Sequence, residues 1–191
     1  MSQTKNFVLR GEEAAMDKIR RNERMSVTMK VLSAAPSRIF TLNYFCGLFG
    51  SAKSTISEDI DALRHMVAAF DLGEIETITG AAGGVLFRPK VSPAGALNYI
   101  TQLSQRLSGS ERVLPGDFLY YSDILSAPDT VNRMGEILAT AFCEVSPDFV
   151  LTMETKGIPV AYATANALGV PLVIARHSSK VYEGSAVNIN Y

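Results

Sequence analysis

A short polar turn between two apolar runs is the stretch of this sequence whose residue types are best suited to bind a ligand. The first run reads DFVLTM (148–153), the turn reads ETKGIP, and the second run, VPLVIAR, ends at residue 176. The residues of the turn with useful chemistry are Glu154, Thr155, Lys156 and Gly157. They precede a predicted helix, whose first backbone N–H groups have no partner within the helix. Free N–H groups, the positive end of a helix, a lysine charge and a glycine that permits close approach together form a phosphate cradle.

A tight turn between a strand and a helix explains the same residues without a ligand. In that interpretation Gly157 serves only the geometry of the backbone. Pro159 fits the first turn of any helix and therefore favours neither interpretation. The spacing of these residues leaves both interpretations open.

Two strands and a helix must position this turn. Residues 149–153 show no alternation of polar and apolar side chains, which is typical of a parallel strand covered on both faces. A helix between two such strands makes a right-handed crossover, which places the turn at the carboxyl edge of the sheet. Ligands of open α/β sheets bind at this edge. The sequence therefore predicts a strand, helix, strand unit over residues 148–176 of an α/β fold.

A second group of candidate residues opens a predicted helix nearer the N-terminus. Thr41 is expected to cap a short helix, LNYFCGLF, that ends at Gly50, and Ser51 is expected to cap the next helix at once. The apolar residues of this next helix follow steps of three and four: Ile56, Ile60, Leu63, Val67 and Phe70. Two helices joined by a tight turn at a glycine form a helix-turn-helix.

A predicted hairpin and an earlier helix complete this unit. Alternating residues at 75–79 are followed by a glycine-rich tip at 80–84, after which the alternation resumes. The earlier helix begins within a basic cluster at 18–24 and carries Val27 and Val31. Three helices and a hairpin make a winged helix, in which the start of the third helix enters the major groove of DNA.

The winged-helix pattern selects residues that could contact DNA. They are Ser51, Lys53, Ser54 and Thr55 at the start of the third helix, and Arg20, Arg21 and Arg24 in the basic cluster. Short hydroxyls and cations at a helix start suit phosphates and base edges. However, three-helix units with a hairpin also mediate protein contacts, and hydroxyl-rich helix starts are simply good caps. Both alternatives stay open on these residues.

The rest of the chain is predicted from apolar stripes. Ser92 and Pro93 open a helix with the stripe Leu97, Ile100, Leu103 and Leu107, and a helix from Pro128 should turn Val131, Met134, Leu138 and Phe142 inward. Residues 115–125 between them are aromatic and partly extended, and residues 177–191 form a predicted loop and strand. Residues 1–17 are polar without periodicity, which predicts a flexible arm.

The composition limits the classes of function. The 191 residues are 47% hydrophobic and carry a net charge of −1, so no global field attracts nucleic acid. Residues 1–64 hold ten Lys and Arg against seven Asp and Glu, whereas residues 65–191 hold eight against twelve, which indicates different partners for the two halves. Two cysteines and two histidines without motif spacing support neither a disulfide framework nor a zinc site. Without a hydrophobic leader or a run of about 18 apolar residues, we expect a cytoplasmic protein with no membrane partner.

Five segments, in order, carry a resemblance to a known family. They are SAKSTISEDI (51–60), GAAGGV (80–85), RVLPGDFLYYSDIL (112–125), TKGIPVAYA (155–163) and KVYEGSAVNINY (180–191). From about Lys18 to Tyr191, the chain resembles the purine operon repressors (PurR) of Gram-positive bacteria. The resemblance implies a homodimeric regulator that binds double-stranded DNA at purine-gene control regions. It also implies a winged-helix domain at 18–91 and an incomplete type I phosphoribosyltransferase-like domain at 92–191.

The resemblance further implies an effector. In this family the phosphoribosyltransferase-like domain binds phosphoribosyl pyrophosphate (PRPP), possibly with Mg²⁺, as a signal and does not convert it. Thr155, Lys156 and Gly157 match the pyrophosphate loop of the family, and Lys180 and Tyr182 fall in the loop that covers the ligand in related transferases. No catalytic residue and no protein-bound metal are implied.

One motif of the family is not present in residues 1–191. It is an acidic pair followed by a phosphate loop rich in small residues and threonine, and it would come just beyond Tyr191. We therefore expect weak or no PRPP binding by this chain and an unpaired sheet edge. The sequence is expected to be a fragment of a longer protein or a truncated variant.

Two other functions fit the same residues. One is a purine phosphoribosyltransferase with an accessory N-terminal domain, although residues 112–191 supply no obvious base-recognition pocket or acid/base residue. The other is a DNA-binding regulator that senses a guanine nucleotide with adjacent phosphates, because the predicted loop binds pyrophosphate rather than the sugar. Nucleotide formation from PRPP and a purine base would favour the enzyme.

Overall fold

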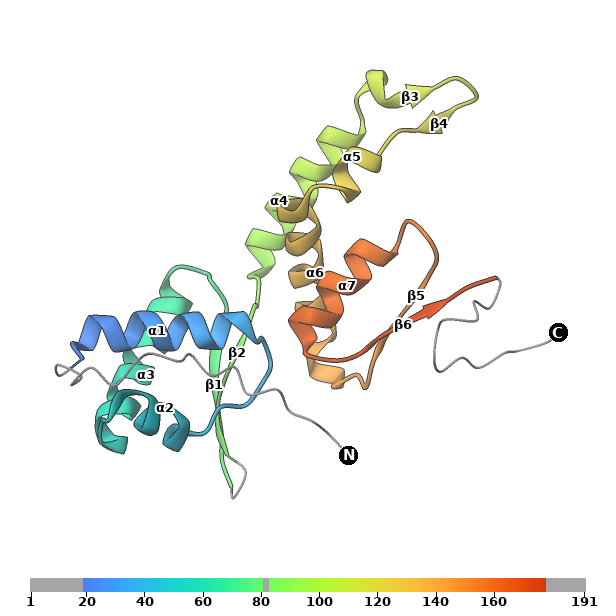
Figure 1. The fold of residues 1–191 in the computed structure, drawn as a ribbon. Coiled ribbons are helices and arrows are strands. Elements are labelled where there is room, and N and C mark those ends of the chain that lie inside the picture. Colours follow the sequence, from blue (N-terminus) through green and yellow to red (C-terminus); the bar gives the residue numbers. More distant parts are fainter. Residues whose placement is uncertain (1–18, 81–82, 178–191) are drawn as a thin grey trace.

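The computed structural model describes residues 19–80 and 83–177, which form two parts joined by an extended segment (Figure 1). The predicted arm at 1–17, the last predicted strand, and the residues Lys180 and Tyr182 lie outside the described residues. Within the described ranges, no helix is both long and apolar enough to cross a membrane.

The first part is a winged helix. Its elements are α1 (Arg21–Ala34), α2 (Leu42–Phe49), α3 (Lys53–Ala69), β1 (Glu74–Ile78) and β2 (Gly84–Arg88). The three helices and the antiparallel β1–β2 hairpin enclose one apolar cluster, in which Phe45, Ile56 and Leu63 are almost fully buried. The fold predicted for this region is confirmed.

The turn between α2 and α3 follows the prediction at α2 but not at α3. Thr41 Oγ1 accepts a hydrogen bond from the Tyr44 amide at 3.2 Å, which caps α2, and Gly50 ends this helix with φ 59°. Ser51 does not cap α3, because the residue before the helix is Ala52. The Ser51 hydroxyl instead donates to the last carbonyl of α2, Phe49, at 3.3 Å.

The buried faces of α1 and α3 differ from the prediction at a few positions. In α3 the predicted residues from Ile56 to Val67 are buried, but Phe70 is 73% exposed because the helix ends at Ala69. In α1 the buried residues are Arg24, Thr28 and Leu32, while Val27 is exposed. Two of these three are polar, so the apolar pattern of α1 does not reveal its buried face.

The segment around Phe40, between α1 and α2, pairs with the β1–β2 hairpin, which is the wing of the winged helix. The amide and carbonyl of Phe40 bond the carbonyl and amide of Val85 in β2, each at 2.8 Å. Gly84 is required beside them, because a Cβ at this position would collide with the Phe40 carbonyl. The chain between α1 and α2 is therefore fastened to the wing.

The second part contains the predicted strand, helix, strand unit. Its elements are α4 (Pro93–Leu107), β3 (Val113–Leu114), β4 (Phe118–Leu119), α5 (Ser122–Leu125), α6 (Pro128–Phe142), β5 (Val150–Met153), α7 (Ile158–Leu168) and β6 (Leu172–Ala175), with 3-10 turns at Ser110–Arg112 and Cys143–Val145. Strands β5 and β6 are parallel, with Val150 opposite Leu172, and α7 connects them. The α/β prediction is confirmed for this unit.

Only one face of the β5–β6 sheet is covered by described residues. Val150 and Thr152 are half-buried, whereas Leu151 and Met153 on the other face are 60% and 75% exposed. The expectation that this strand is covered on both faces is therefore wrong for the described chain. Helix α7 packs on one face, and no described element packs on the other.

Helices α6 and α7 pack closely because small residues meet between them. The buried residues of α6 are Thr130, Val131, Gly135 and Ala139. Of the residues predicted to face inward, only Val131 is buried, while Leu138 and Phe142 are exposed. A close helix contact selects small side chains, which a search for large apolar residues overlooks.

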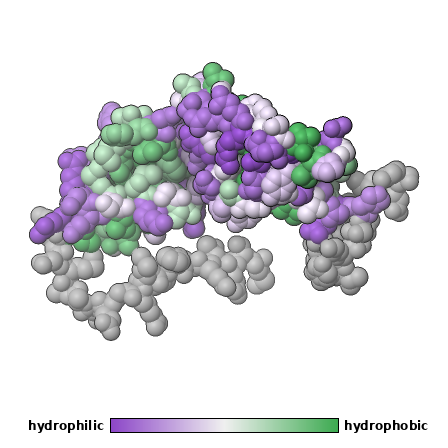
Figure 2. Space-filling view, turned by 90° about the horizontal axis from the view of Figure 1, so that it is seen from above, coloured by the Kyte–Doolittle hydropathy of each residue, from purple (hydrophilic) through white to green (hydrophobic). Residues whose placement is uncertain are grey.

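The apolar stripe predicted for α4 is not buried either. Ser92 caps this helix as predicted, because its hydroxyl accepts a hydrogen bond from the Gly95 amide at 3.1 Å. Leu97 and Ile100 are nevertheless exposed, and no residue of α4 is fully buried. Figure 1 shows that α4 leads away from α7 toward the β3–β4 hairpin. Figure 2 shows that hydrophobic residues also form patches on the surface of the molecule.

Gly135→Ala is expected to lower the free energy of unfolding by about 1–3 kcal/mol. Its added Cβ would lie 2.6 Å from the backbone carbon of Ala163 in α7. Gly47→Ala in α2 is the matched control, because nothing lies within 4 Å of that Cβ, and it should stabilise the chain by about 0.5–1 kcal/mol. Urea unfolding gives the free energy of unfolding of both variants. Equal stability of Gly135→Ala and the parent chain would contradict the close contact between α6 and α7.

Candidate nucleic-acid interface and anion-binding loop

The amino end of α3 lies at the surface of the winged helix. Lys53 and Ser54 are exposed, and Thr55 and Ser51 are half-buried. The Lys53 ammonium pairs with no carboxylate among the residues that the structure describes. These side chains therefore stand where a helix entering the major groove would present them.

Arg24 does not belong to this surface, contrary to the prediction. Its Nε donates to Asp59 Oδ2 at 2.8 Å, its Nη1 donates to the Ile19 carbonyl at 2.9 Å, and its side chain is only 10% exposed. The guanidinium is held between α1 and α3 and cannot reach a phosphate. The prediction that Arg24 contacts a DNA phosphate is therefore wrong, and Arg24 instead links α1 to α3.

The other two arginines of the basic cluster are exposed at the start of α1. Arg21 Nε donates to Asp59 Oδ1 at 3.1 Å, but the side chain stays 60% exposed. Arg20 is also exposed, and its amide donates to Glu23 Oε2 at 2.8 Å. Their DNA contacts stay predictions.

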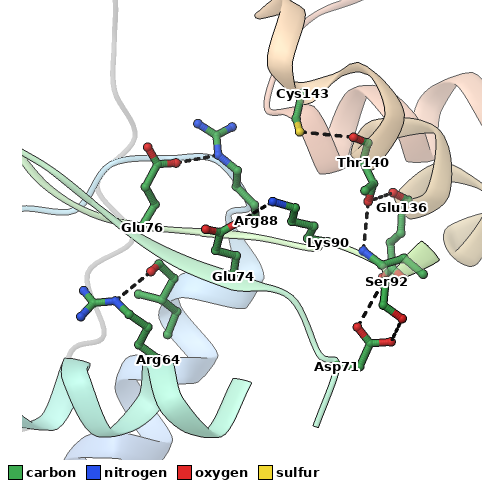
Figure 3. Close-up of polar contacts among 12 residues, drawn as sticks. Arg64, Asp71, Glu74, Glu76, Arg88, Lys90, Ser92, Glu136, Thr140 and Cys143 are labelled. Carbon is green, nitrogen blue, oxygen red and sulfur yellow. Dashed lines mark hydrogen bonds and ion pairs between the residues drawn. The ribbon is translucent and has the colours of Figure 1, made fainter. Parts of the chain in front are cut away.

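Arg64 fastens the wing to α3 and was missed by the sequence analysis. Figure 3 shows its side chain reaching from α3 to β1, where Nε donates to the Ile75 carbonyl at 3.0 Å. Its Nη2 donates to Thr77 Oγ1 at 2.6 Å, and Nη1 pairs with Asp61. No pattern within one helix predicts these contacts, because Ile75 and Thr77 lie on a different element.

The loop before α7 has the free N–H groups that the phosphate cradle requires. The amides of Thr155, Lys156 and Gly157 donate to no acceptor in the part of the chain that the structure describes. Only the first amide of the turn is occupied, because Glu154 donates to the Ala175 carbonyl at 3.0 Å. All four residues are exposed at the carboxyl end of β5. This arrangement suits an anion at the start of α7.

Gly157 is required by a close approach rather than by its backbone angles. Its φ of −74° is open to any residue. A Cβ at this position, however, would lie 2.7 Å from Thr152 Oγ1 on β5. The glycine therefore lets the loop and the start of α7 sit close to the strand.

Lys156 is held by residues that the sequence analysis did not select. Its Nζ donates to Ser122 Oγ at 2.8 Å and lies 5.8 Å from the centre of the Tyr121 ring. Both partners stand at the start of α5 and come from one of the segments that resemble the repressor family. The loop lysine is thus positioned by a segment 34 residues away in sequence.

A bidentate ion pair supports α5 in this position. Arg112 Nη1 and Nη2 donate to the two carboxylate oxygens of Asp123 at 2.9 and 3.0 Å. The hydrogen bond from Arg112 holds the pKa of Asp123 below its ordinary value. The pair therefore persists at neutral pH.

The Asp123 carboxyl is expected to titrate below its ordinary pKa of 3.8, and Arg112→Gln should raise the midpoint toward that value. Because the folded-state pKa is lowered, the stabilisation is present above the ordinary pKa and is lost as pH falls through the folded value. An NMR titration of the Asp123 carboxyl carbon measures the midpoint. A midpoint unchanged by Arg112→Gln would contradict the ion pair.

Glu154 places a negative charge beside the loop, but neighbouring groups hold it. Its Oε1 accepts a hydrogen bond from the His177 amide at 3.2 Å, and its Oε2 lies 3.9 Å from Arg176 Nη1. The carboxylate therefore leans toward the end of β6. Within the described ranges, no group of three His, Cys, Asp or Glu residues could hold a metal ion.

Comparison with known proteins identifies the first part of the chain. Residues 20–89 match the family model described as bacterial purine repressor, N-terminal. This segment is therefore similar to the N-terminal part of bacterial purine repressors. The matched segment contains α1, α2, α3 and the wing, and with them the exposed start of α3.

Several relatives align with 91% of the chain and carry related names. The chain is 42% identical over 174 residues to the probable purine biosynthesis transcriptional regulator PurR of Streptococcus pneumoniae, covering 91% of this chain and 63% of the relative. It is 41% identical to the purine biosynthesis transcriptional repressor PurR of Bacillus subtilis (91% and 61%), and 36% identical to the purine biosynthesis transcriptional activator PurR of Lactococcus lactis (91% and 64%). The resemblance found in the sequence is confirmed. The chain spans less than two thirds of the length of these relatives.

A second kind of relative matches a shorter stretch. The chain is 39% identical over 72 residues to the xanthine phosphoribosyltransferase of Deinococcus deserti, which covers 36% of this chain and 37% of that enzyme. The similarity to phosphoribosyltransferases is therefore partial.

Proposed function

We propose that this chain is a DNA-binding transcriptional regulator of purine synthesis and transport genes. The observation that carries the proposal is the exposed amino end of α3, in the segment that matches the N-terminal model of bacterial purine repressors. The names of the relatives support it, since they include a repressor and an activator of purine biosynthesis genes. Because both kinds occur, the proposal covers regulation of either sign, with repression as the default.

The winged helix would bind DNA through charges at the start of α3. Lys53 would neutralise a phosphate, while Ser54 and Thr55 would donate to phosphate oxygens or base edges in the major groove. Arg20 and Arg21 would add phosphate contacts from the start of α1. Arg64 would not touch DNA but would hold the wing in register with α3.

The loop before α7 would bind PRPP as an effector. Its free amides and the Lys156 charge suit a pyrophosphate, and Mg²⁺ would travel with that ligand. An effector changes DNA affinity only if it binds the DNA-free and DNA-bound forms unequally. A guanine nucleotide with adjacent phosphates would use the same amides and is the alternative effector.

We propose a regulatory rather than catalytic role for this second part. The relatives that align with 91% of the chain are named as regulators, whereas the phosphoribosyltransferase aligns with 36%. Incubation with PRPP and xanthine separates the two functions, because only an enzyme forms the nucleotide. We also propose a homodimer, since helix-turn-helix proteins read two half-sites with two subunits.

The proposal is tested by DNA binding with and without effector. The complete protein is titrated with fluorescent DNA from a purine-gene control region and with a scrambled duplex, each with and without PRPP and Mg²⁺. We expect tighter binding to the control region and a different dissociation constant when PRPP is present. Equal affinity for both duplexes would overturn specific DNA binding, and equal constants with and without PRPP would overturn only the signalling.

Lys156→Ala is expected to reduce the effect of PRPP on the dissociation constant without changing DNA affinity in the absence of effector. The ammonium near the loop would be lost, while the winged helix stays intact. The matched control is Arg106→Ala, which removes an exposed cation near the end of α4. The same titration measures both, and an unchanged PRPP response in Lys156→Ala would place the effector elsewhere.

A further inference from the structure

Helix α7 joins the anion-binding loop to the winged helix. Its first residue follows Gly157, and its eleven residues span about 16 Å. At the other end, Ser37 Oγ donates to the Ala167 carbonyl at 3.0 Å. The Ser37 amide donates to the Phe87 carbonyl of β2 at 2.8 Å. Ser37, a residue of the winged helix, thus donates hydrogen bonds to the wing and to the carboxyl end of α7.

The backbones on the two sides of this contact approach closely. Ser37 has φ 60°, a left-handed conformation that is uncommon for serine. Gly169 has φ 71°, and a Cβ there would lie 2.9 Å from the Ser37 Cβ. A shift of α7 therefore cannot pass this point without moving Ser37 or breaking its hydrogen bond.

The segment between the two parts is held on both sides. The Val91 amide donates to Thr140 Oγ1 of α6 at 3.0 Å, and Asp71 after α3 accepts from the Ser92 hydroxyl at 2.7 Å (Figure 3). A cleft of about 740 Å³ lies beside this segment, lined by residues of α3, β1, α4 and α6. The connecting segment is thus hydrogen-bonded to both parts, and a cleft lies beside it.

We propose that Ser37 couples the loop to the DNA-binding surface. A ligand that draws the free amides of the loop toward it displaces the start of α7, and the close packing on Gly135 makes α6 and α7 move together. The displacement reaches Ser37 through the Ala167 carbonyl. Ser37 is three residues before Phe40, which pairs with the wing, and the position of α3 against the wing changes with it. This inference rests on the proposed effector function.

The test measures coupling rather than binding. DNA dissociation constants are determined for the complete protein with and without PRPP and Mg²⁺, in the parent, Ser37→Ala and Ser37→Gly. Both variants remove the hydroxyl, and glycine also relaxes the left-handed backbone, so a shared effect comes from the hydrogen bond. We expect the ratio of the two constants to fall roughly 2- to 10-fold toward one, as for the loss of one hydrogen bond.

Ser33→Ala is the matched control, because the Ser33 hydroxyl donates within α1 to the Lys30 carbonyl. It should keep the ratio of the parent. If the parent responds to PRPP and both Ser37 variants respond equally, the coupling role of Ser37 is overturned and the effector function stands. If the parent itself has equal constants with and without PRPP, the effector function and the coupling role of Ser37 are both overturned, while DNA binding stands.

Discussion

Asp59→Ala is expected to lower the free energy of unfolding by about 3–5 kcal/mol, the range for breaking a buried ion pair. Asp59 is 3% exposed and accepts hydrogen bonds from Arg24 at 2.8 Å and from Arg21 at 3.1 Å. Without it, the Arg24 guanidinium stays buried, and among the described residues the Ile19 carbonyl is its remaining acceptor. Urea unfolding of the whole chain, followed by circular dichroism, measures the loss.

Asp61→Ala is the matched control on the same helix. Asp61 also pairs with an arginine, but it is 56% exposed, so its loss should cost less than about 1 kcal/mol. The double variant Arg24→Met, Asp59→Leu should recover most of the stability, because it removes both buried charges and keeps apolar volume. A cost at Asp59 as small as that at Asp61 would contradict the buried pair between α1 and α3.

Lys53→Ala is expected to weaken binding to every DNA duplex by roughly tenfold, about 1.4 kcal/mol. Lys53 stands exposed at the start of α3 without an ion-pair partner among the described residues, so its charge is available to a phosphate. Losing one phosphate contact should also reduce the slope of log K against log salt by about 0.9. Fluorescence anisotropy at three salt concentrations measures both effects.

Arg106→Ala again serves as the control, because it removes a cation from α4, outside the winged helix. It should leave the affinity and the salt slope unchanged. Equal losses of DNA affinity in the two variants would mean that the affinity depends on the net charge of the chain rather than on the start of α3. A Lys53 variant that binds like the parent would place the DNA contact on another surface.

The winged helix could be predicted because its signals are local. Thr41 and Gly50 mark the ends of α2, and the three- and four-residue steps from Ile56 to Val67 follow the buried side of α3. The loop before α7 could be placed for the same reason, since an apolar strand, a polar turn and a helix start are adjacent in sequence. The free amides before α7 agree with that prediction.

The buried faces of α1 and α6 were predicted incorrectly for one physical reason. Helix α1 buries Arg24 and Thr28, and α6 buries Gly135 and Ala139, so neither helix buries a large apolar stripe throughout. Arg24 is stable in a buried position only because Asp59 lies opposite it. Gly135 favours close helix packing only because α7 lies against it. Single-helix periodicity contains no information about that second partner.

The sequence by itself determined the winged helix and the position of the loop before α7, because each depends on neighbours within one turn or one strand. Only the tertiary structure decided that Arg24 is enclosed by Asp59, that Lys156 meets Ser122, and that Ser37 meets α7 across 130 residues of chain. Such contacts depend on the angles and distances between packed elements, and those are set by the packing of the whole chain.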